Sequence, residues 1–295
     1  MPDFTGLNVA AAHRALAAAL RDAGFDTAAL DARLLLQGVL TCDASDLARN
    51  PERLLSKDEA EQVSDVAHQR LAHKPVSRIF GRREFYGRDF VINERVLDPR
   101  ADSETLIEAA LAHLPNGCEA RILDLGTGSG CLLLTLLAER EKTSGVAADV
   151  SPHALRVALD NAERLGVTER VEFVESDWFK NVAGAFDVVV SNPPYLTPGE
   201  MEFLDRNVAD YDPHLALYGG ADGLTPYKLI CAEAENFLVP NGWLIFEIGA
   251  LQARAVSRMM RETGYANVSV RQDLAGRDRV VLGQCKPDKI GTAKK

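Results

Sequence analysis

The feature that most restricts the fold is a glycine-rich turn between two apolar runs near the middle of the chain. Residues 121–125 (Arg-Ile-Leu-Asp-Leu) are typical of a buried strand, and residues 131–138 (Cys-Leu-Leu-Leu-Thr-Leu-Leu-Ala) of a buried helix. The turn between them is Gly-Thr-Gly-Ser-Gly. Glycines let the backbone approach a ligand closely, and a helix N-terminus offers free N–H groups. The stretch predicts a cradle for a nucleotide-like cofactor, with a plain tight turn as the alternative.

The spacing of the glycines argues against a dinucleotide. The dinucleotide fingerprint is Gly-x-Gly-x-x-Gly or Ala, whereas here Gly130 comes one residue early and Cys131 takes the last position. Asp124 lies just before the turn, where its negative charge suits a cationic ligand better than a pyrophosphate. A direct contact between Asp124 and the ligand does not follow from the sequence.

Apolar runs alternate with helix-like segments from residue 121 to about residue 262. This alternation predicts a parallel sheet with right-handed crossovers. Residues 268–271 and 279–284 have no helix-like segment between them, so they predict an antiparallel hairpin at the end of the sheet.

Two further residues follow predicted strands of this sheet. Asp149 closes the run 144–149, where an acid can accept both ribose hydroxyls of a nucleoside; helix capping is the alternative. Trp178 follows the run 171–174 and can cover an adenine, although a core tryptophan is a serious alternative.

A second motif, Asn-Pro-Pro-Tyr at residues 192–195, follows the apolar run 186–191. Two prolines cannot continue a ladder, so the chain must leave the sheet at its carboxyl edge, where ligands of open α/β sheets bind. The Asn192 oxygen and the Pro193 carbonyl can each accept an N–H from a planar NH2 group, and Tyr195 can pack on its flat face. An ordinary strand-ending turn is the alternative. The long segment 196–223 is interpreted as a substrate-contacting loop.

The remainder of the chain predicts a helical region and a connecting hairpin. Residues 1–75 are helix-like, with helices expected over 10–20 and 27–40 and a capping box at 56–59 that begins a third. Residues 76–98 predict a β-hairpin turning near Gly87, residues 102–114 a helix, and residues 286–295 a loose tail.

Composition narrows the possible functions. The chain has 295 residues, of which 46% are hydrophobic, and no apolar run long enough to cross a membrane, and its N-terminus lacks a basic signal region. Five scattered cysteines and six scattered histidines favour free thiols in a reducing cytosol and disfavour a metal site. A net charge of −10 disfavours bulk electrostatic binding to nucleic acid.

Taken in order, the motifs resemble those of class I S-adenosylmethionine-dependent methyltransferases. They are most similar to the HemK/PrmC-type enzymes, which methylate a glutamine side-chain amide in peptide-chain release factors. The similarity covers roughly residues 5–285 and includes Asp-Ala-Arg-Leu-Leu-Leu at 31–36, Gly-Arg-Arg-Glu-Phe-Tyr at 81–86, Pro-Arg-Ala-Asp-Ser-Glu at 99–104 and Asp-Arg-Val-Val-Leu-Gly at 278–283. Ala101, Ser103 and Tyr-Asp-Pro-His at 211–214 depart from the family pattern, on the substrate side.

The resemblance implies an α/β fold: a Rossmann-like seven-stranded sheet with an antiparallel C-terminal hairpin, plus an N-terminal helical bundle domain. The implied domains are a helical substrate-recognition domain (1–75), a hairpin linker (76–98), a methyltransferase domain (99–285) and a flexible tail (286–295). The implied cofactor is S-adenosyl-L-methionine, bound by Asp124, Gly126, Thr127, Gly128, Ser129, Gly130, Asp149, Trp178 and Asn192.

The implied reaction is methylation of the glutamine in the Gly-Gly-Gln motif of release factors. Asn192, Pro193 and Tyr195 are the expected catalytic residues, and Asn192, Pro193, Pro194 and Tyr195 the expected substrate contacts. A glutamine methyltransferase of ribosomal protein and a DNA or RNA methyltransferase acting on the adenine amino group are the alternatives. The expected enzyme is a cytoplasmic monomer without a metal, a membrane segment or stably bound nucleic acid.

Overall fold

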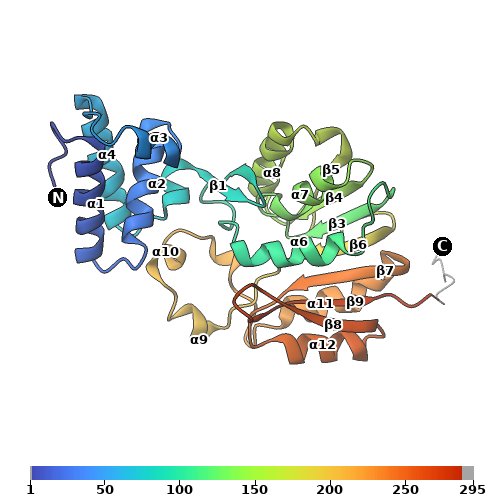
Figure 1. Cartoon of the computed structure of the whole chain (residues 1–295). Helices are drawn as coiled ribbons and strands as arrows, with labels where there is room; N and C mark the ends of the chain where they lie inside the picture. Colours follow the sequence, from blue (N-terminus) through green and yellow to red (C-terminus); the bar gives the residue numbers. More distant parts are fainter. Residues whose placement is uncertain (1, 288–295) are drawn as a thin grey trace. The chain divides into compact units, whose positions relative to one another are not determined.

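The computed structural model describes residues 2–287, which divide into two compact units (Figure 1). The first comprises the residues up to Gly81 together with Asp205–Tyr211. The second comprises Arg82–Leu204 and the residues from Asp212 onward. The N-terminal unit therefore extends beyond residue 75, where the sequence placed its end, and it includes a segment from a loop of the second unit.

The first unit is helical, as predicted. Asn8 caps its first helix, and Ser56 and Glu59 form the predicted capping box at the start of the fourth. The buried residues Leu16, Leu35 and Val63 belong to one shared core. The helices are α1 (Val9–Asp22), α2 (Ala28–Leu40), α3 (Ala44–Arg49), α4 (Lys57–Leu71), α5 (Val76–Phe80) and, from the loop segment, α10 (Arg206–Ala209).

The predicted hairpin is shorter than expected. Strands β1 (Arg82–Phe85) and β2 (Arg88–Val91) pair antiparallel around Gly87, but residues 76–80 form helix α5 instead of strand. Pro75 precedes that helix with a fixed φ of −58°, and Gly81 ends it in the left-handed conformation. A proline followed by a glycine six residues later is thus a helix signal, and the strand assignment for residues 76–80 is wrong.

The second unit is built on a seven-stranded sheet of strand order β5-β4-β3-β6-β7-β9-β8. The first four neighbouring pairs are parallel, and β9 pairs antiparallel with both β7 and β8. This arrangement confirms the predicted parallel sheet with an antiparallel C-terminal hairpin. The strands are β3 (Arg121–Leu125), β4 (Ser144–Asp149), β5 (Val171–Glu175), β6 (Phe186–Ser191), β7 (Leu238–Glu247), β8 (Ala266–Gln272) and β9 (Asp278–Gln284).

Helices cover both faces of the sheet, because the central strands are apolar on both sides (Figure 1). Along β3, Ile122 packs with α6, α7 and α8, whereas Leu123 packs with α11 and α12. The predicted helix 102–114 corresponds to the short helix η1 (Ala101–Ser103) followed by α6 (Glu104–Leu111). The covering helices are α6 (Glu104–Leu111), α7 (Cys131–Glu139), α8 (Pro152–Leu165), α11 (Thr225–Glu233) and α12 (Ala253–Glu262).

The remaining elements are single turns of helix in connections. They are η1 (Ala101–Ser103), η2 (Thr168–Arg170), η3 (His214–Ala216), η4 (Ala234–Asn236) and α9 (Pro198–Met201). The predicted loose tail, residues 286–295, lies outside the described residues from position 288 onward.

Candidate active site

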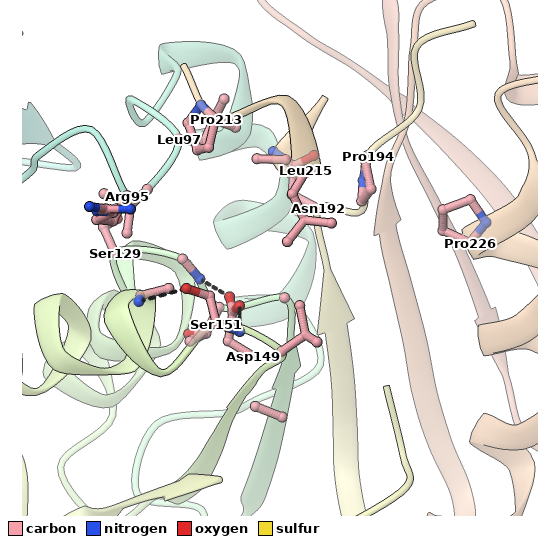
Figure 2. A pocket seen from close by; sticks show the side chains of 18 of the residues that line it. Arg95, Leu97, Ser129, Asp149, Ser151, Asn192, Pro194, Pro213, Leu215 and Pro226 are labelled. Carbon is pink, nitrogen blue, oxygen red and sulfur yellow. Dashed lines mark hydrogen bonds between the residues drawn. The ribbon is translucent and has the colours of Figure 1, made fainter. Parts of the chain in front are cut away.

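A cavity of about 630 Å³ opens at the carboxyl ends of the central strands of the second unit. The turn after β3, Asp149 at the end of β4 and Asn192 after β6 all line it, so the structure brings the two sequence motifs to one site (Figure 2). The volume lies in the range of small-molecule and cofactor pockets, about 300–1,000 Å³.

The glycine-rich turn forms the floor of the cradle. The N–H groups of Gly126 and Thr127 both donate to the Ala148 carbonyl, at 2.8 and 3.0 Å, which ties the turn to β4. Gly128 has a φ of 56°, and no atom lies within 4 Å of where its side chain would be. Gly126, Thr127, Gly128 and Ser129 line the cavity. Gly130 serves packing instead, because a Cβ there would lie 2.8 Å from Leu134.

Asp149 holds the turn from the neighbouring strand. Its carboxylate accepts the Gly128 N–H and the Ser151 N–H, each at 2.9 Å (Figure 2). Burial raises the pKa of Asp149, and these N–H groups act in the opposite direction. A partly buried, oriented carboxylate at this position can accept further hydrogen bonds from ribose hydroxyls.

Asp124 is completely buried beneath the same turn. Its Oδ2 accepts a hydrogen bond from the Thr127 hydroxyl at 2.7 Å, while Oδ1 has no hydrogen-bond partner within residues 2–287. Burial is the main cause that raises the pKa of Asp124 to about 7, and the hydrogen bond from Thr127 opposes it. A buried carboxyl with an unpaired oxygen favours a nearby positive charge.

Trp178 lines the cavity and also packs against the core cluster on the α11–α12 face, so both interpretations of this residue have a structural basis. Its backbone has a φ of 50°, and its carbonyl accepts a hydrogen bond from the Ser176 hydroxyl at 2.7 Å. A bulky residue in the left-handed region is strained, and here the hydrogen bond holds it in place.

The four residues of Asn-Pro-Pro-Tyr lie in different environments. Asn192 and Pro194 line the cavity, Pro193 is buried, and Tyr195 packs against the core cluster of the α11–α12 face. Burial is the main cause that raises the pKa of Tyr195 to about 12. The Ser191 hydroxyl donates to the Leu125 carbonyl at 2.7 Å, which joins the strand ends that precede both motifs.

The chain beyond Tyr195 is held by contacts that the sequence did not predict. The Leu196 N–H donates to the Leu217 carbonyl at 2.9 Å, and the Gln252 amide donates to the Tyr195 carbonyl at 3.1 Å. Gly219 packs so closely that a Cβ there would lie 2.6 Å from the Tyr195 Cα. The predicted substrate loop 196–223 therefore starts from a fixed point. It contains α9 and α10.

Two other wall segments were also missed by sequence reasoning. Arg95, Leu97 and Arg100, from the segment before α6, line the cavity, as do Leu215 of η3 and Leu229 of α11. Of these, only Arg100 lies in a motif singled out in the sequence, residues 99–104, and the tertiary fold brings them all to the strand ends. Across residues 2–287 there is no group of three acidic, histidine or cysteine side chains that could hold a metal ion. No helix in that range is long and apolar enough to cross a membrane.

The strand order and the turn–helix cradle define a class I methyltransferase. A methyltransferase from Pyrococcus furiosus has a similar fold, with a TM-score of 0.53 and 18% identity over 76% of this chain and 99% of that chain. Two family models match: the PrmC N-terminal domain over residues 11–81 and the methyltransferase small domain over residues 101–214.

Among curated relatives, the release factor glutamine methyltransferase of Cereibacter sphaeroides is 45% identical over 93% of this chain and 98% of its own length. That of Rhodospirillum rubrum is 43% identical over 90% of this chain and 81% of its own length. The chain belongs to the release factor glutamine methyltransferase family.

Proposed function

We propose that this protein transfers a methyl group from S-adenosyl-L-methionine to the side-chain amide nitrogen of the glutamine in the Gly-Gly-Gln motif of a release factor. One observation supports this most directly: in a chain of this family, Asn192 faces the same cavity as the glycine-rich turn and Asp149.

The residues on the cofactor side fit S-adenosylmethionine. Asp149 offers carboxylate oxygens to the ribose, and the open side of Gly128 leaves room for the ligand against the backbone. Trp178 offers an aromatic face for the adenine. The buried carboxyl of Asp124 favours a sulfonium cation over a neutral thioether, which would help the product to leave.

On the acceptor side, the chain must orient a poor nucleophile. When bound, S-adenosylmethionine supplies a methyl group activated by the adjacent sulfonium. An amide nitrogen has its lone pair delocalised into the carbonyl. The Asn192 oxygen and the Pro193 carbonyl can accept its N–H groups and stabilise the positive charge that develops as the N–C bond forms and a proton leaves. Positioning and preorganised dipoles are therefore the main contributions, and Pro194 supplies a rigid wall beside the acceptor, with Tyr195 packed against the core behind it.

Because release factors act on ribosomes, we place the enzyme in the cytoplasm. We propose that it acts as a monomer, since one chain supplies every wall of the cavity. The net charge of −10 favours a protein substrate over nucleic acid held by bulk electrostatics.

The test is a methyl-transfer assay with S-adenosylmethionine and a purified release factor, read by mass spectrometry of the Gly-Gly-Gln peptide. One added methyl on the glutamine is expected, with none on a release factor whose glutamine is replaced by glutamate. Parallel reactions contain a large-subunit ribosomal protein and adenine-containing DNA and RNA. Methylation in one of those reactions alone would reject the release factor as the substrate.

A further inference from the structure

A buried carboxyl group lies directly beside the proposed catalytic asparagine. Glu247 is the last residue of β7, and its side chain is 2% exposed. Ser191 of β6 pairs with Phe246 of β7, so the residues that follow them, Asn192 and Glu247, lie side by side at the carboxyl edge of the sheet. Glu247 lies in no motif recognised in the sequence, and the chemistry proposed above does not use it.

The Glu247 carboxyl lies beside Asn192, and one of its oxygens lacks a hydrogen-bond partner in the described part of the chain. The side chains of Ser103 and Asn192 lie near the carboxyl and favour its ionised form. Its Oε2 atom is fully buried and has no hydrogen-bond partner within residues 2–287. On the other side, Val280 of β9 pairs with Glu247 in the sheet, and the neighbouring Arg279 contributes its positive charge. Burying a carboxyl in this way is costly, which suggests a use for it.

The orientation of the Asn192 amide decides what the cavity offers to an acceptor. An asparagine side chain has an NH2 donor at one end and a carbonyl acceptor at the other. An ionised carboxylate only accepts hydrogen bonds, so it attracts the NH2 end and leaves the oxygen facing away. A protonated carboxyl can instead donate to the Asn192 oxygen, which would reverse the orientation of the amide.

We propose that Glu247 is a positioning residue: its carboxylate holds the NH2 end of Asn192, so that the Asn192 oxygen faces the cavity and accepts the N–H of the acceptor amide. This inference rests on the function proposed above, because it assigns a purpose to the orientation of Asn192. Glu247 itself need not contact the substrate.

The proposal predicts a dependence on pH, because only the ionised carboxyl gives the required orientation. Burial is the main cause that raises the pKa of Glu247 to about 7. A raised carboxyl pKa means that the ionised form accumulates as the pH rises through about 7, so kcat is expected to rise over that range. The charged or titratable groups that interact with Glu247 are Arg279, Asp102, Tyr195, Tyr227 and Cys131.

Few of these neighbours change charge between pH 6 and 8.5. The pKa values of Tyr195 and Cys131 are raised to about 12, and that of Tyr227 is raised well above its ordinary value, in each case mainly by burial. Burial also raises the pKa of Asp124 to about 7, and it raises the pKa of Asp149 above its ordinary value. The pH profile of the unmodified enzyme therefore contains these carboxyls as well as Glu247, and a variant is needed to separate them.

The experiment compares the wild type, Glu247→Gln and the exposed control Glu233→Gln by steady-state methylation of a release factor between pH 6 and 8.5. At pH 8.5 the kcat of Glu247→Gln is expected to be about 10- to 100-fold below the wild type, because glutamine does not fix the amide orientation. At pH 6 the two rates should converge, since most wild-type Glu247 is then neutral. Glu233→Gln should follow the wild type throughout.

A double-mutant cycle separates positioning from folding. If Glu247 acts through Asn192, then Glu247→Gln should cause no further loss of kcat in an Asn192→Ala background. Calorimetry with S-adenosylmethionine, which needs no methyl transfer, should give unchanged cofactor affinity. A ratio of rates that stays constant with pH, or equal losses with and without Asn192, would overturn the inference. A wild-type enzyme that methylates no glutamine would instead reject the proposed function.

Discussion

At the scale of single residues, Asp149 has two tasks at one position. It accepts the N–H groups of Gly128 and Ser151, which shapes the cradle, and it retains lone pairs for a ligand. The sequence predicted the second task from the place of Asp149 at the end of a strand. The first task depends on how closely the turn after β3 approaches β4, which no local pattern specifies.

Replacing Asp149 by alanine tests its cofactor role. Loss of hydrogen bonds to the ribose, and of the support for the turn, should weaken binding of S-adenosylmethionine by roughly 1–3 kcal/mol. The matched control is Glu175→Ala, which removes an exposed carboxyl from the end of the neighbouring strand β5. Isothermal calorimetry measures both variants. Unchanged affinity in Asp149→Ala would remove Asp149 from the cofactor site.

Asn192 is expected to act on the acceptor and not on the cofactor or the fold. Its side chain is only partly buried and lines the cavity, so Asn192→Ala should lower the melting temperature only slightly, through the contact that the Glu247 carboxyl loses. The loss of a preorganised polar contact should lower kcat by roughly 100-fold or more. Asn181→Ala is the control, because it truncates an exposed asparagine.

Methylation kinetics, cofactor titration and a melting curve are measured on the same Asn192→Ala preparation. Near-normal turnover would contradict the acceptor role. A collapsed melting temperature would indicate that Asn192 serves the fold.

At the scale of elements, the exit from β6 is the most constrained connection of the site. The Gly219 N–H donates to the Leu196 carbonyl at 2.8 Å, and the chain at Gly219 passes against the backbone of Pro194 and Tyr195. The Gln252 side chain joins this exit to the loop at Gly223 and to the start of α12. The rigidity expected from the two prolines is thus reinforced by a second layer of backbone.

Gly219 and Pro194 both line the cavity, and Gly219→Ala should disturb this exit without removing any polar side chain of the site. The added Cβ would lie 2.8 Å from the Pro194 carbonyl oxygen and closer still to the Tyr195 Cα, so the backbone must shift. A shift of about 1 Å near reacting groups lowers kcat roughly 100-fold. The control is Gly199→Ala, because no atom lies within 4 Å of a Cβ at that glycine.

Steady-state kinetics on both glycine variants test whether kcat falls in Gly219→Ala alone. Equal activity in Gly219→Ala and Gly199→Ala would show that the exit tolerates movement, and the catalytic turn would then not depend on close packing at Gly219.

Elements with a strong sequence period were predictable, and those that depend on distant segments were not. The strands 121–125, 144–149 and 186–191 match β3, β4 and β6, because continuous apolar runs bounded by turns leave little freedom in a buried parallel sheet. Helix α5 was assigned as strand, since five residues carry no clear period. Gln252 and Gly219 could not be recognised, because their roles arise only where separate segments of the chain meet.

At the scale of the whole molecule, the chain passes from the helical unit into the sheet unit and returns to the helical unit for Asp205–Tyr211. That segment lies in the loop that follows Asn-Pro-Pro-Tyr. Within the helical unit, Arg70 donates to the Asn207 side chain at 3.1 Å, and the Tyr211 hydroxyl donates to the Ala72 carbonyl at 3.1 Å. The conformation of the proposed substrate loop therefore depends on the integrity of the helices.

Arg70 is itself held by a buried ion pair, and this gives a prediction for the molecule as a whole. Its Nε donates to Asp31 Oδ2 at 2.8 Å, with both side chains less than 10% exposed. Asp31→Ala leaves a buried positive charge without its partner, which typically costs about 3–5 kcal/mol. The free energy of unfolding of the helical unit should fall by about that amount, less for Asp31→Asn, and not at all for the exposed control Asp65→Ala.

Cofactor affinity should be unchanged in Asp31→Ala, because every residue that lines the cavity belongs to the sheet unit. Methylation of a release factor should be lost at the temperature where the helices unfold. Hydrogen exchange of α1, α2 and α4 reports the stability of the helical unit, and calorimetry with S-adenosylmethionine reports the cavity. If cofactor affinity and helix protection fell together, the two units would unfold as one, and the helices would support the cavity as well as the substrate loop.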